Sequence, residues 1–164
     1  MILIKNNQRT IPINTQEIKH AANILLDILE YSDFDLGIWF ASDKTIRTYN
    51  KKYRNKDKAT DILSFPYHTE LVAGKRIKPA CEEDKNLGDM IIAPQYVRTY
   101  LAKDNNIAVN KVTPEMLQDR MHVLLIHGLY HLLGYDHETD KEYAAMHRKE
   151  IALKKKLKAT LSAR

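Results

Sequence analysis

Three histidines within the eleven residues from His127 to His137 constrain this chain more than any other feature of its sequence. His127 and His131 are four residues apart, so on a helix they lie on the same face. Gly134 follows them, and glycine readily ends a helix because it adopts the left-handed conformation without strain. The chain can then reverse and bring His137 back toward the first two rings. This spacing predicts three neutral imidazoles around one zinc ion, with a fourth position open to water.

The residue after the first histidine distinguishes this motif from that of the metzincin proteases, which share the spacing His-x-x-x-His-x-x-Gly-x-x-His. Those proteases have glutamate at that position as the general base. Here the position is Gly128, and the next carboxylate along the chain is Asp136. The metal ligands are therefore present without the usual base for peptide hydrolysis. A glycine beside the first ligand also predicts that another segment of backbone approaches the helix closely at this point.

A basic segment precedes the histidines in the chain. Residues 44–58 contain seven lysine and arginine side chains, with Asp43 and Asp57 as their acidic neighbours, and the whole chain has a formal net charge of +5. Such a run is often only a solvated face, but beside a hydrolytic metal it suits a polyanionic substrate. Arginine can hold phosphate oxygens through two parallel hydrogen bonds, which lysine cannot do. The residues predicted to bind the polyanion are Lys51, Lys52, Arg54, Lys56 and Lys58.

The hydrophobic pattern predicts a single α+β domain over residues 1–164, a length that supports a substantial core. We expect a mixed sheet of about four strands packed against helices. The apolar helix at 113–133 should be central and should carry His127 and His131. The expected strands cover residues 2–6, 33–40, 61–66 and 87–93. The expected helices cover residues 15–31, 42–53, 94–105, 113–133 and 139–157.

Three segments together resemble the YbeY family of bacterial single-domain, metal-dependent endoribonucleases. They are the stretch from His127 to His137 and residues 53–66 and 87–92, in the order and spacing of that family. Two positions depart from the family pattern, because Tyr130 stands where leucine is common and Ala59 where proline is usual. The resemblance covers nearly the whole chain. It implies a zincin-like architecture in which His127, His131 and His137 hold one Zn²⁺ ion.

The resemblance also implies an activity and partners. It identifies the polyanion as RNA and the protein as a zinc-dependent, single-strand-specific endoribonuclease of ribosomal RNA maturation, including 16S rRNA 3′-end processing, and of ribosome quality control. Ribosomal RNA precursors and proteins of the small ribosomal subunit are the implied partners. The family's functional arginine corresponds to Arg54, which would stabilise charge on the reacting phosphate. Asp136 is predicted either to act as a base or to orient the neighbouring ligand, with a structural role in turning the chain after Gly134 as the alternative.

The C-terminal segment is predicted to be helical and strongly basic. Met146 and Glu150 form a Met-x-x-x-Glu pattern that the family also shows, and we expect Met146 to pack in the core rather than to bind metal. The helix is expected to fray beyond Leu157, which leaves a basic tail from about residue 158. This tail can contact RNA or simply keep the chain soluble.

The remaining sequence indicates a protein of the reducing cytoplasm. The single cysteine, Cys81, cannot form an internal disulfide, and its three acidic neighbours disfavour a thiolate. No apolar stretch approaches the ~18 residues of a membrane span. The apolar start of the chain, residues 1–5, is too short for a secretory signal.

Two alternative functions remain open from the sequence. One is a metallopeptidase that uses a base from elsewhere in the fold. The other is a non-catalytic ribosome-assembly factor whose zinc is structural. Structural zinc normally has four protein ligands, whereas three are evident here, so Cys81 is the residue to exclude as a fourth ligand.

Overall fold

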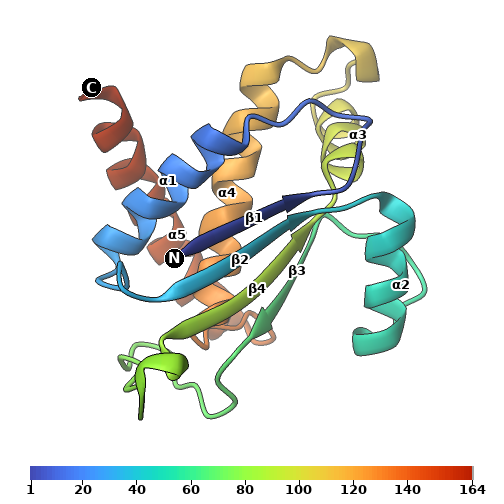
Figure 1. Cartoon of the computed structure of the whole chain (residues 1–164). Helices are drawn as coiled ribbons and strands as arrows, with labels where there is room; N and C mark the ends of the chain where they lie inside the picture. Colours follow the sequence, from blue (N-terminus) through green and yellow to red (C-terminus); the bar gives the residue numbers. More distant parts are fainter. Residues whose placement is uncertain (164) are drawn as a thin grey trace.

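The elements of the chain follow one another in the predicted order (Figure 1). The computed structural model describes residues 1–163 and shows an α+β domain with four strands, five α-helices and two short 3₁₀ turns. Among the described residues, no helix combines the length and the apolar character that a membrane span requires. The strands are β1 (Ile2–Asn6), β2 (Asp35–Phe40), β3 (Ile62–Pro66) and β4 (Asn86–Ile92). The helical elements are α1 (Thr15–Ile28), α2 (Asp43–Arg54), η1 (Glu82–Asp84), α3 (Pro94–Asp104), η2 (Val109–Lys111), α4 (Pro114–Leu132) and α5 (Asp140–Ser162).

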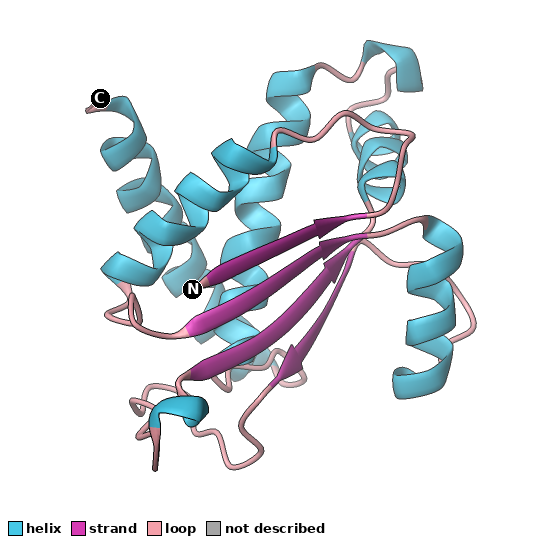
Figure 2. Ribbon diagram, viewed as in Figure 1, coloured by secondary structure: helices cyan, strands magenta, loops and turns pink. Residues whose placement is uncertain are grey.

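The four strands form one mixed sheet in the order β1-β2-β4-β3, which Figure 2 shows in a single view. β1, β2 and β4 run parallel, and β3 pairs antiparallel with β4 along one edge. Parallel neighbours need a crossover connection, which α1 supplies between β1 and β2. The predicted mixed sheet packed against helices is therefore confirmed. Because β3 is an edge strand, its outer backbone groups are available to side chains from other elements.

The two faces of the sheet are covered very differently. Alternate side chains of β2 and β4, such as Ile38, Phe40 and Met90, are fully buried in the main core with α1, α4 and α5. In Figure 1, α4 passes behind the strands. On the opposite face α2 covers one end, and beyond it the sheet is open, with Leu3 of β1 66% exposed. The small buried cluster under α2 consists of Ala41, Ile46, Leu63, Ile91 and Ala93.

α4 crosses the sheet close to β3 and β4, and Gly128 allows this close approach. A Cβ atom added at Gly128 would lie 2.6 Å from Met90 Sδ and 3.0 Å from Ile62 Cδ1. The atoms nearest to this position belong to side chains of the two strands rather than to their backbone. The preceding residue, His127, consequently lies beside the edge strand β3 and borders the same surface as Ile62.

α1 ends at Ile28, which is earlier than predicted. Glu30 has a φ of 63°, and this left-handed conformation is incompatible with continuing a right-handed helix. Tyr31 then turns into the core and packs edge-on against Phe34, with ring centroids 4.9 Å apart. Tyr31 therefore belongs to the core contacts between α1 and β2 rather than to the helix itself.

The end of α5 also differs from the prediction. The helix does not fray at Leu157, because Leu157 is fully buried and Leu161 packs against the same core one turn later. Lys158 Nζ lies 3.1 Å from Asp119 Oδ1 of α4, so this basic side chain pairs within the domain. A separate basic tail from about residue 158 is therefore wrong for residues 158–162. The last basic residue of the predicted tail, Arg164, lies outside the described residues.

Candidate metal centre

The end of α4 explains how the third histidine reaches the first two. Gly134 has a φ of 89°, and its amide donates to the His131 carbonyl at 3.0 Å. The Tyr135 amide donates to the Tyr130 carbonyl at 2.9 Å, and the two tyrosine rings pack edge-on with centroids 5.2 Å apart. These contacts form a Schellman motif, in which a left-handed residue satisfies the last helical carbonyls and reverses the chain. The predicted turn at Gly134 is confirmed, and it returns His137 toward α4.

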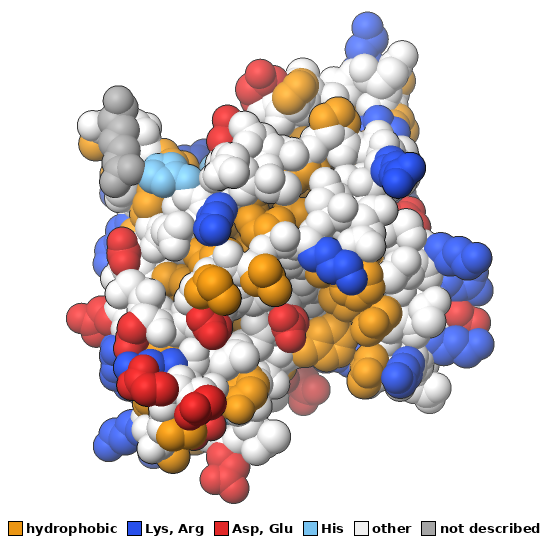
Figure 3. Space-filling view, viewed as in Figure 1, with side chains coloured by type: hydrophobic (Ala, Val, Ile, Leu, Met, Phe, Trp, Pro, Cys, Tyr) orange, Lys and Arg blue, Asp and Glu red, His pale blue; other side chains and the backbone are white. Residues whose placement is uncertain are grey.

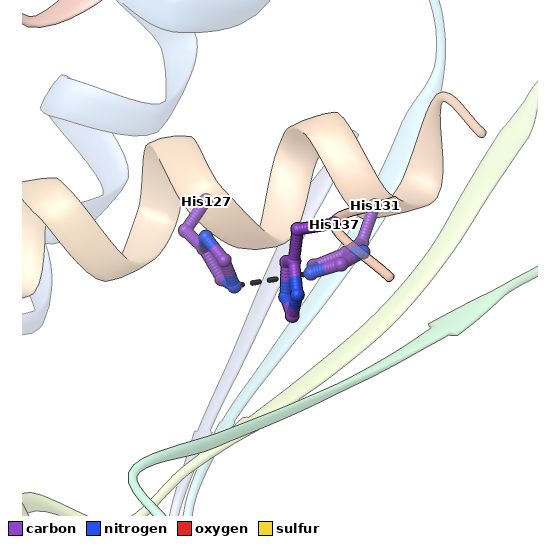
Figure 4. A group of neighbouring side chains, drawn as sticks. All are labelled: His127, His131 and His137. Atoms are coloured by element: carbon purple, nitrogen blue, oxygen red, sulfur yellow. Dashed lines mark hydrogen bonds between the residues drawn. The ribbon is translucent and has the colours of Figure 1, made fainter. Parts of the chain in front are cut away.

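The three histidine side chains converge on one point. His127 Nε2 and His131 Nε2 are 3.0 Å apart, and one ligand atom from each of the three rings lies within 4.8 Å of the others. Figure 4 shows His127 and His131 reaching from adjacent turns of α4 toward His137, which comes from the following segment. The centroid of the His137 ring is 5.4 Å from that of His127 and 5.0 Å from that of His131. The predicted cluster is confirmed, and it can hold a metal ion.

Hydrogen bonds fix the orientation of two of these rings. His127 Nδ1 is 2.6 Å from Glu150 Oε1 of α5, and His131 Nδ1 is 3.0 Å from the Tyr135 carbonyl oxygen. Both partners are acceptors, so we assign the proton of each ring to Nδ1, which leaves the Nε2 lone pairs facing the centre of the cluster. Two lone pairs 3.0 Å apart repel each other unless a cation neutralises them. The donor set therefore fits a divalent transition metal, for which imidazole nitrogen is a preferred ligand.

The His131 side chain is held in its neutral form. Burial lowers its pKa from 6.5 to about 4, and the nearby His127 and His137 act in the same direction. A metal ligand must be deprotonated before it binds. At neutral pH the His131 ring therefore has no proton to lose from Nε2, and metal binding at this residue does not compete with protonation.

Glu150 is a residue of the site that the sequence analysis did not assign. Burial tends to raise the pKa of Glu150, but the hydrogen bond with His127 and the electrostatic influence of the neighbouring His127, His147 and His131 rings outweigh this and lower the pKa below its ordinary value. An ionised carboxylate behind a ligating histidine fixes the ring and raises its basicity. The Met-x-x-x-Glu pattern in the sequence could have pointed to Glu150 as part of the site. Met146 is buried in the core, as predicted, and Glu150 one turn later reaches His127.

Glu150→Gln is expected to lower the affinity for added Zn²⁺ about 10- to 100-fold, the usual effect of losing the partner behind a metal ligand. Glutamine keeps the size of the side chain and can still accept a hydrogen bond. The loss of Zn²⁺ affinity would therefore measure the contribution of the negative charge of Glu150. Competition with a chelator measures the affinity, and circular dichroism checks the helices. His147→Gln is the matched control, because His147 is exposed on the same helix and lies 3.7 Å from the other Glu150 oxygen. Equal Zn²⁺ affinity in Glu150→Gln and the wild type would show that this carboxylate does not support the site.

The histidine cluster opens into a cavity of about 770 Å³ between α2, β3 and the end of α4. α2 ends at Arg54 because Asn55 takes the left-handed conformation, with a φ of 55°. Arg54 Nη2 then donates to the Ser64 carbonyl on the edge strand at 2.9 Å, which tethers the guanidinium and leaves its other N–H groups for a ligand. Asn50 Nδ2 donates to the Lys58 carbonyl at 2.8 Å and holds the loop after α2. The predicted site residues that line the cavity are Arg54, Lys56, Lys58, His127, His131, Asp136 and His137.

Two of the predicted RNA contacts do not line this cavity. Lys51 Nζ lies 3.3 Å from Asp57 Oδ2, and Arg47 Nε lies 2.9 Å from the other oxygen of the same aspartate. Such exposed pairs contribute little to stability, but they neutralise part of the basic segment. Lys52 lies over the Tyr53 ring, with Nζ 5.0 Å from the ring centroid. Contact of Lys51 and Lys52 with RNA stays a prediction.

Two other residues considered for the site have local roles in the structure. Asp136 Oδ1 accepts a hydrogen bond from the His137 amide at 2.8 Å, the kind of contact that an orienting or chain-turning role requires. A general-base role for Asp136 stays a prediction. Cys81, considered as a fourth ligand, is exposed beside η1. Within residues 1–163, the group able to hold a metal consists of the three histidines.

Tyr130, which departs from the leucine common in the family, joins α4 to α5. Its hydroxyl donates to the Lys149 carbonyl at 3.2 Å, a contact that leucine could not make. Burial raises the pKa of Tyr130 to about 12, so the hydroxyl keeps its proton. Because Lys149 precedes Glu150, this bond holds the part of α5 from which Glu150 reaches His127.

Comparisons with known proteins agree with this geometry. A family model described as Endoribonuclease YbeY matches residues 3–158. A human protein of that description is 37% identical over 152 residues, which cover 93% of this chain and 85% of the human one. A protein of the same description from Francisella tularensis subsp. novicida is 34% identical over 151 residues, covering 92% of this chain and 84% of its own. The solution structure of a Thermotoga maritima protein, 22% identical, shares the fold with a TM-score of 0.61 over 99% of this chain and 93% of the other.

Proposed function

The chain belongs to the YbeY family, and we propose that it is a zinc-dependent endoribonuclease specific for single-stranded RNA. The observation that carries the proposal is the histidine cluster, which opens into a cavity that Arg54, Lys56 and Lys58 also line. Three protein ligands that leave a position open are typical of catalytic zinc, here with one ion per chain. By family resemblance the substrate is precursor ribosomal RNA in the cytoplasm, including the 3′ end of 16S rRNA. Contact with small-subunit proteins and a part in ribosome quality control belong to the same proposal.

Zinc would supply the electrophilic chemistry of this site, because it lowers the pKa of water to ~7 and polarises phosphoryl oxygens. The residues of the chain would hold the ion and keep its ligands aligned. His127, His131 and His137 would bind it through their ring nitrogens. The Glu150 carboxylate and the Tyr135 carbonyl fix the orientation of the first two rings. The site therefore needs little rearrangement to accept the ion.

Arg54 would place positive charge against the phosphate. Its bond to the Ser64 carbonyl orients the guanidinium, whose remaining N–H groups can form two parallel hydrogen bonds with phosphate oxygens. Negative charge on these oxygens increases as the phosphodiester reacts, so a positioned donor stabilises the transition state more than the bound substrate. Lys56 and Lys58 are exposed on the same cavity, where they would attract the RNA backbone.

The metallopeptidase alternative requires a base other than the absent glutamate. Gly128 occupies that position, and the acidic residues that line the cavity are Asp61, Asp136 and Glu138. The discriminating experiment gives the zinc-loaded protein an unstructured RNA and an unstructured protein under the same conditions. We expect cleavage of the RNA while the protein substrate stays intact, and the opposite result would identify a peptidase. Duplex RNA of the same sequence is the control for strand specificity and should resist cleavage.

The second alternative, a non-catalytic assembly factor with structural zinc, needs a fourth protein ligand. The three histidines form the metal-holding group within the described part of the chain, and Cys81 is exposed beside η1. The cluster also lies on an open cavity rather than being enclosed by protein. These features favour a catalytic ion over a structural one.

Salt dependence tests the basic residues that are predicted to bind RNA. If Lys52, Arg54, Lys56 and Lys58 each neutralise about one phosphate, the log–log slope of RNA affinity against salt should be near −3, at ~0.7 per phosphate. Lys58→Ala should then reduce the slope by about 0.7. Lys155→Ala, on the exposed side of α5, is the control and should leave the slope unchanged. An affinity that does not depend on salt would mean that the basic segment is only a solvated face.

A further inference from the structure

Four aromatic side chains form a continuous row at the end of the open sheet face, where α2 crosses it. This aromatic row consists of Trp39 and Phe65 from β2 and β3, and Tyr49 and Tyr53 from α2. Successive ring centroids are 5.4 Å apart from Trp39 to Tyr49, 5.9 Å from Tyr49 to Tyr53 and 5.3 Å from Tyr53 to Phe65. Tyr49 and Tyr53 stack at 27°, because residues four apart share one side of a helix. In Figure 3 the face of the sheet near α2 shows hydrophobic surface with Lys and Arg side chains around it.

The row leaves part of its aromatic surface exposed to water. Tyr53 is 53% exposed, and Trp39, Tyr49 and Phe65 are partly exposed above the small buried cluster under α2. A row that served only to cover this cluster would not need to present so much of Tyr53 to water. Contiguous exposed apolar surface rimmed by polar groups commonly marks a binding surface.

Positive charge lies directly on the row. Lys5 Nζ is 4.6 Å from the centroid of the Trp39 ring, and Lys52 Nζ is 5.0 Å from that of the Tyr53 ring. These flexible ammonium groups can move from the rings to nearby anions when another flat group stacks there. Asp89 brings an acidic group to the same face, opposite Phe65 in the strand register. Aromatic rings beside cations are the features with which proteins bind single-stranded nucleic acid, through stacked bases and paired phosphates.

The aromatic row borders the cavity of the histidine cluster. Tyr53 directly precedes Arg54 on α2, and Phe65 directly follows Ser64 on β3. Leu63 and Ser64 line the cavity, and the next residue of β3, Phe65, belongs to the row. Arg54 spans this edge through its hydrogen bond to the Ser64 carbonyl. An RNA strand that leaves the cavity at Arg54 therefore reaches the row after crossing one edge strand.

We propose that the aromatic row binds unpaired bases of the RNA substrate, outside the cavity where the phosphodiester is cut; this inference rests on the proposed function. Bases would stack on the exposed ring of Tyr53 and along the row toward Trp39. Lys5 and Lys52 would pair with the phosphates between these bases. Stacking accepts every base, so the row favours unpaired RNA over duplex RNA without reading its sequence.

The single tryptophan of the chain, Trp39, gives a direct readout of this binding. Rapid mixing of the zinc-loaded protein with an unstructured RNA of about twelve nucleotides should quench Trp39 fluorescence before cleavage proceeds. Tyr53→Ala should weaken the affinity for this RNA at least about fivefold, the lower end of the effect of losing one stacked base. An RNA of about four nucleotides, enough to occupy the cavity alone, should bind both proteins equally.

Two control variants separate the ring of Tyr53 from other effects. Tyr53→Phe keeps the ring and should bind the longer RNA like the wild type. Tyr100→Ala removes a tyrosine of α3 that is 41% exposed, and this variant should also bind the longer RNA like the wild type. The inference is overturned if the longer RNA is cleaved without quenching Trp39 fluorescence and binds Tyr53→Ala with wild-type affinity. The row would then be a surface for a protein partner and not for RNA. Failure of the proposed function would show separately, as absence of cleavage of both RNAs. The quenching and the Tyr53 variants would then still decide whether the row binds RNA.

Discussion

His131→Ala is expected to lose its bound zinc and its cleavage of single-stranded RNA while it keeps the fold. The alanine removes one of three ligands whose nitrogen atoms meet at one point, and His127 and His137 remain. Loss of a direct ligand should lower Zn²⁺ affinity by more than about 100-fold, beyond the effect of removing a residue behind a ligand. The fold should survive, because Leu129 and Leu132 anchor this turn of α4 in the core and are fully buried.

The experiment combines zinc content after dialysis, single-strand RNA cleavage and thermal unfolding. His127→Ala and His137→Ala should behave like His131→Ala, since the three rings form one cluster. His122→Gln is the matched control on the same helix, because its buried ring contacts Gln118 at 3.3 Å and lies away from the cluster. Full zinc occupancy in all three alanine variants would exclude the cluster as the metal site. Loss of zinc with normal RNA cleavage would show that the reaction does not need the metal.

The cluster could be predicted from the sequence because its geometry is local. His127 and His131 are placed by the period of one helix, and Gly134 determines how that helix ends. The contacts that close the turn, between Tyr130 and Tyr135, join residues five apart in the chain. None of these features depends on how distant parts of the chain pack. A motif within one helix and its cap therefore specifies most of a metal site by itself.

The remainder of the site depends on tertiary packing, which periodicity does not determine. Glu150 reaches His127 because α5 packs along α4, and no spacing within one helix predicts that contact. Arg54 lies near the cluster because β3 is the edge strand of the sheet, and the strand order was not predictable from the strand positions. The part of the sheet face that lies open beyond α2 follows from the same strand order. The sequence thus indicated the charged side chains of α2 without showing which of them line the cavity of the histidine cluster.

The error at the end of α5 has a different cause. Leu153, Leu157 and Leu161 recur at helical spacing, so the pattern needed to extend the helix was present in the sequence. The many lysines around them suggested a solvated tail. In the structure the lysines lie on the outer side of the helix, and Lys158 pairs with Asp119. Charge density alone was a poor guide here, because a helix can be basic on one side and anchored in the core on the other.

Arg54→Lys is expected to keep metal and RNA affinity but to lose cleavage. Lysine keeps the positive charge, so RNA affinity should stay within roughly threefold of the wild type, less than ~1 kcal/mol. It cannot reproduce the planar fork that donates two parallel hydrogen bonds to phosphate oxygens. Nor can a lysine ammonium group both hold the Ser64 carbonyl and present such a fork to the cavity. Loss of one positioned donor typically lowers turnover ~10²–10³-fold, or about 3–4 kcal/mol, so single-turnover cleavage should fall at least about tenfold.

The measurement is single-turnover cleavage at saturating enzyme, together with direct RNA binding and zinc content. Arg47→Lys is the matched control, because Arg47 lies on the same helix and pairs with the exposed Asp57 instead of lining the cavity. A loss of affinity in Arg54→Lys with unchanged cleavage at saturation would make Arg54 an anchor for the RNA backbone. Unchanged cleavage and affinity at full zinc content would remove Arg54 from the reaction. A selective loss of the cleavage rate is the result that a tethered, bidentate phosphate donor requires, because the hydrogen bond to Ser64 fixes its direction before the substrate binds.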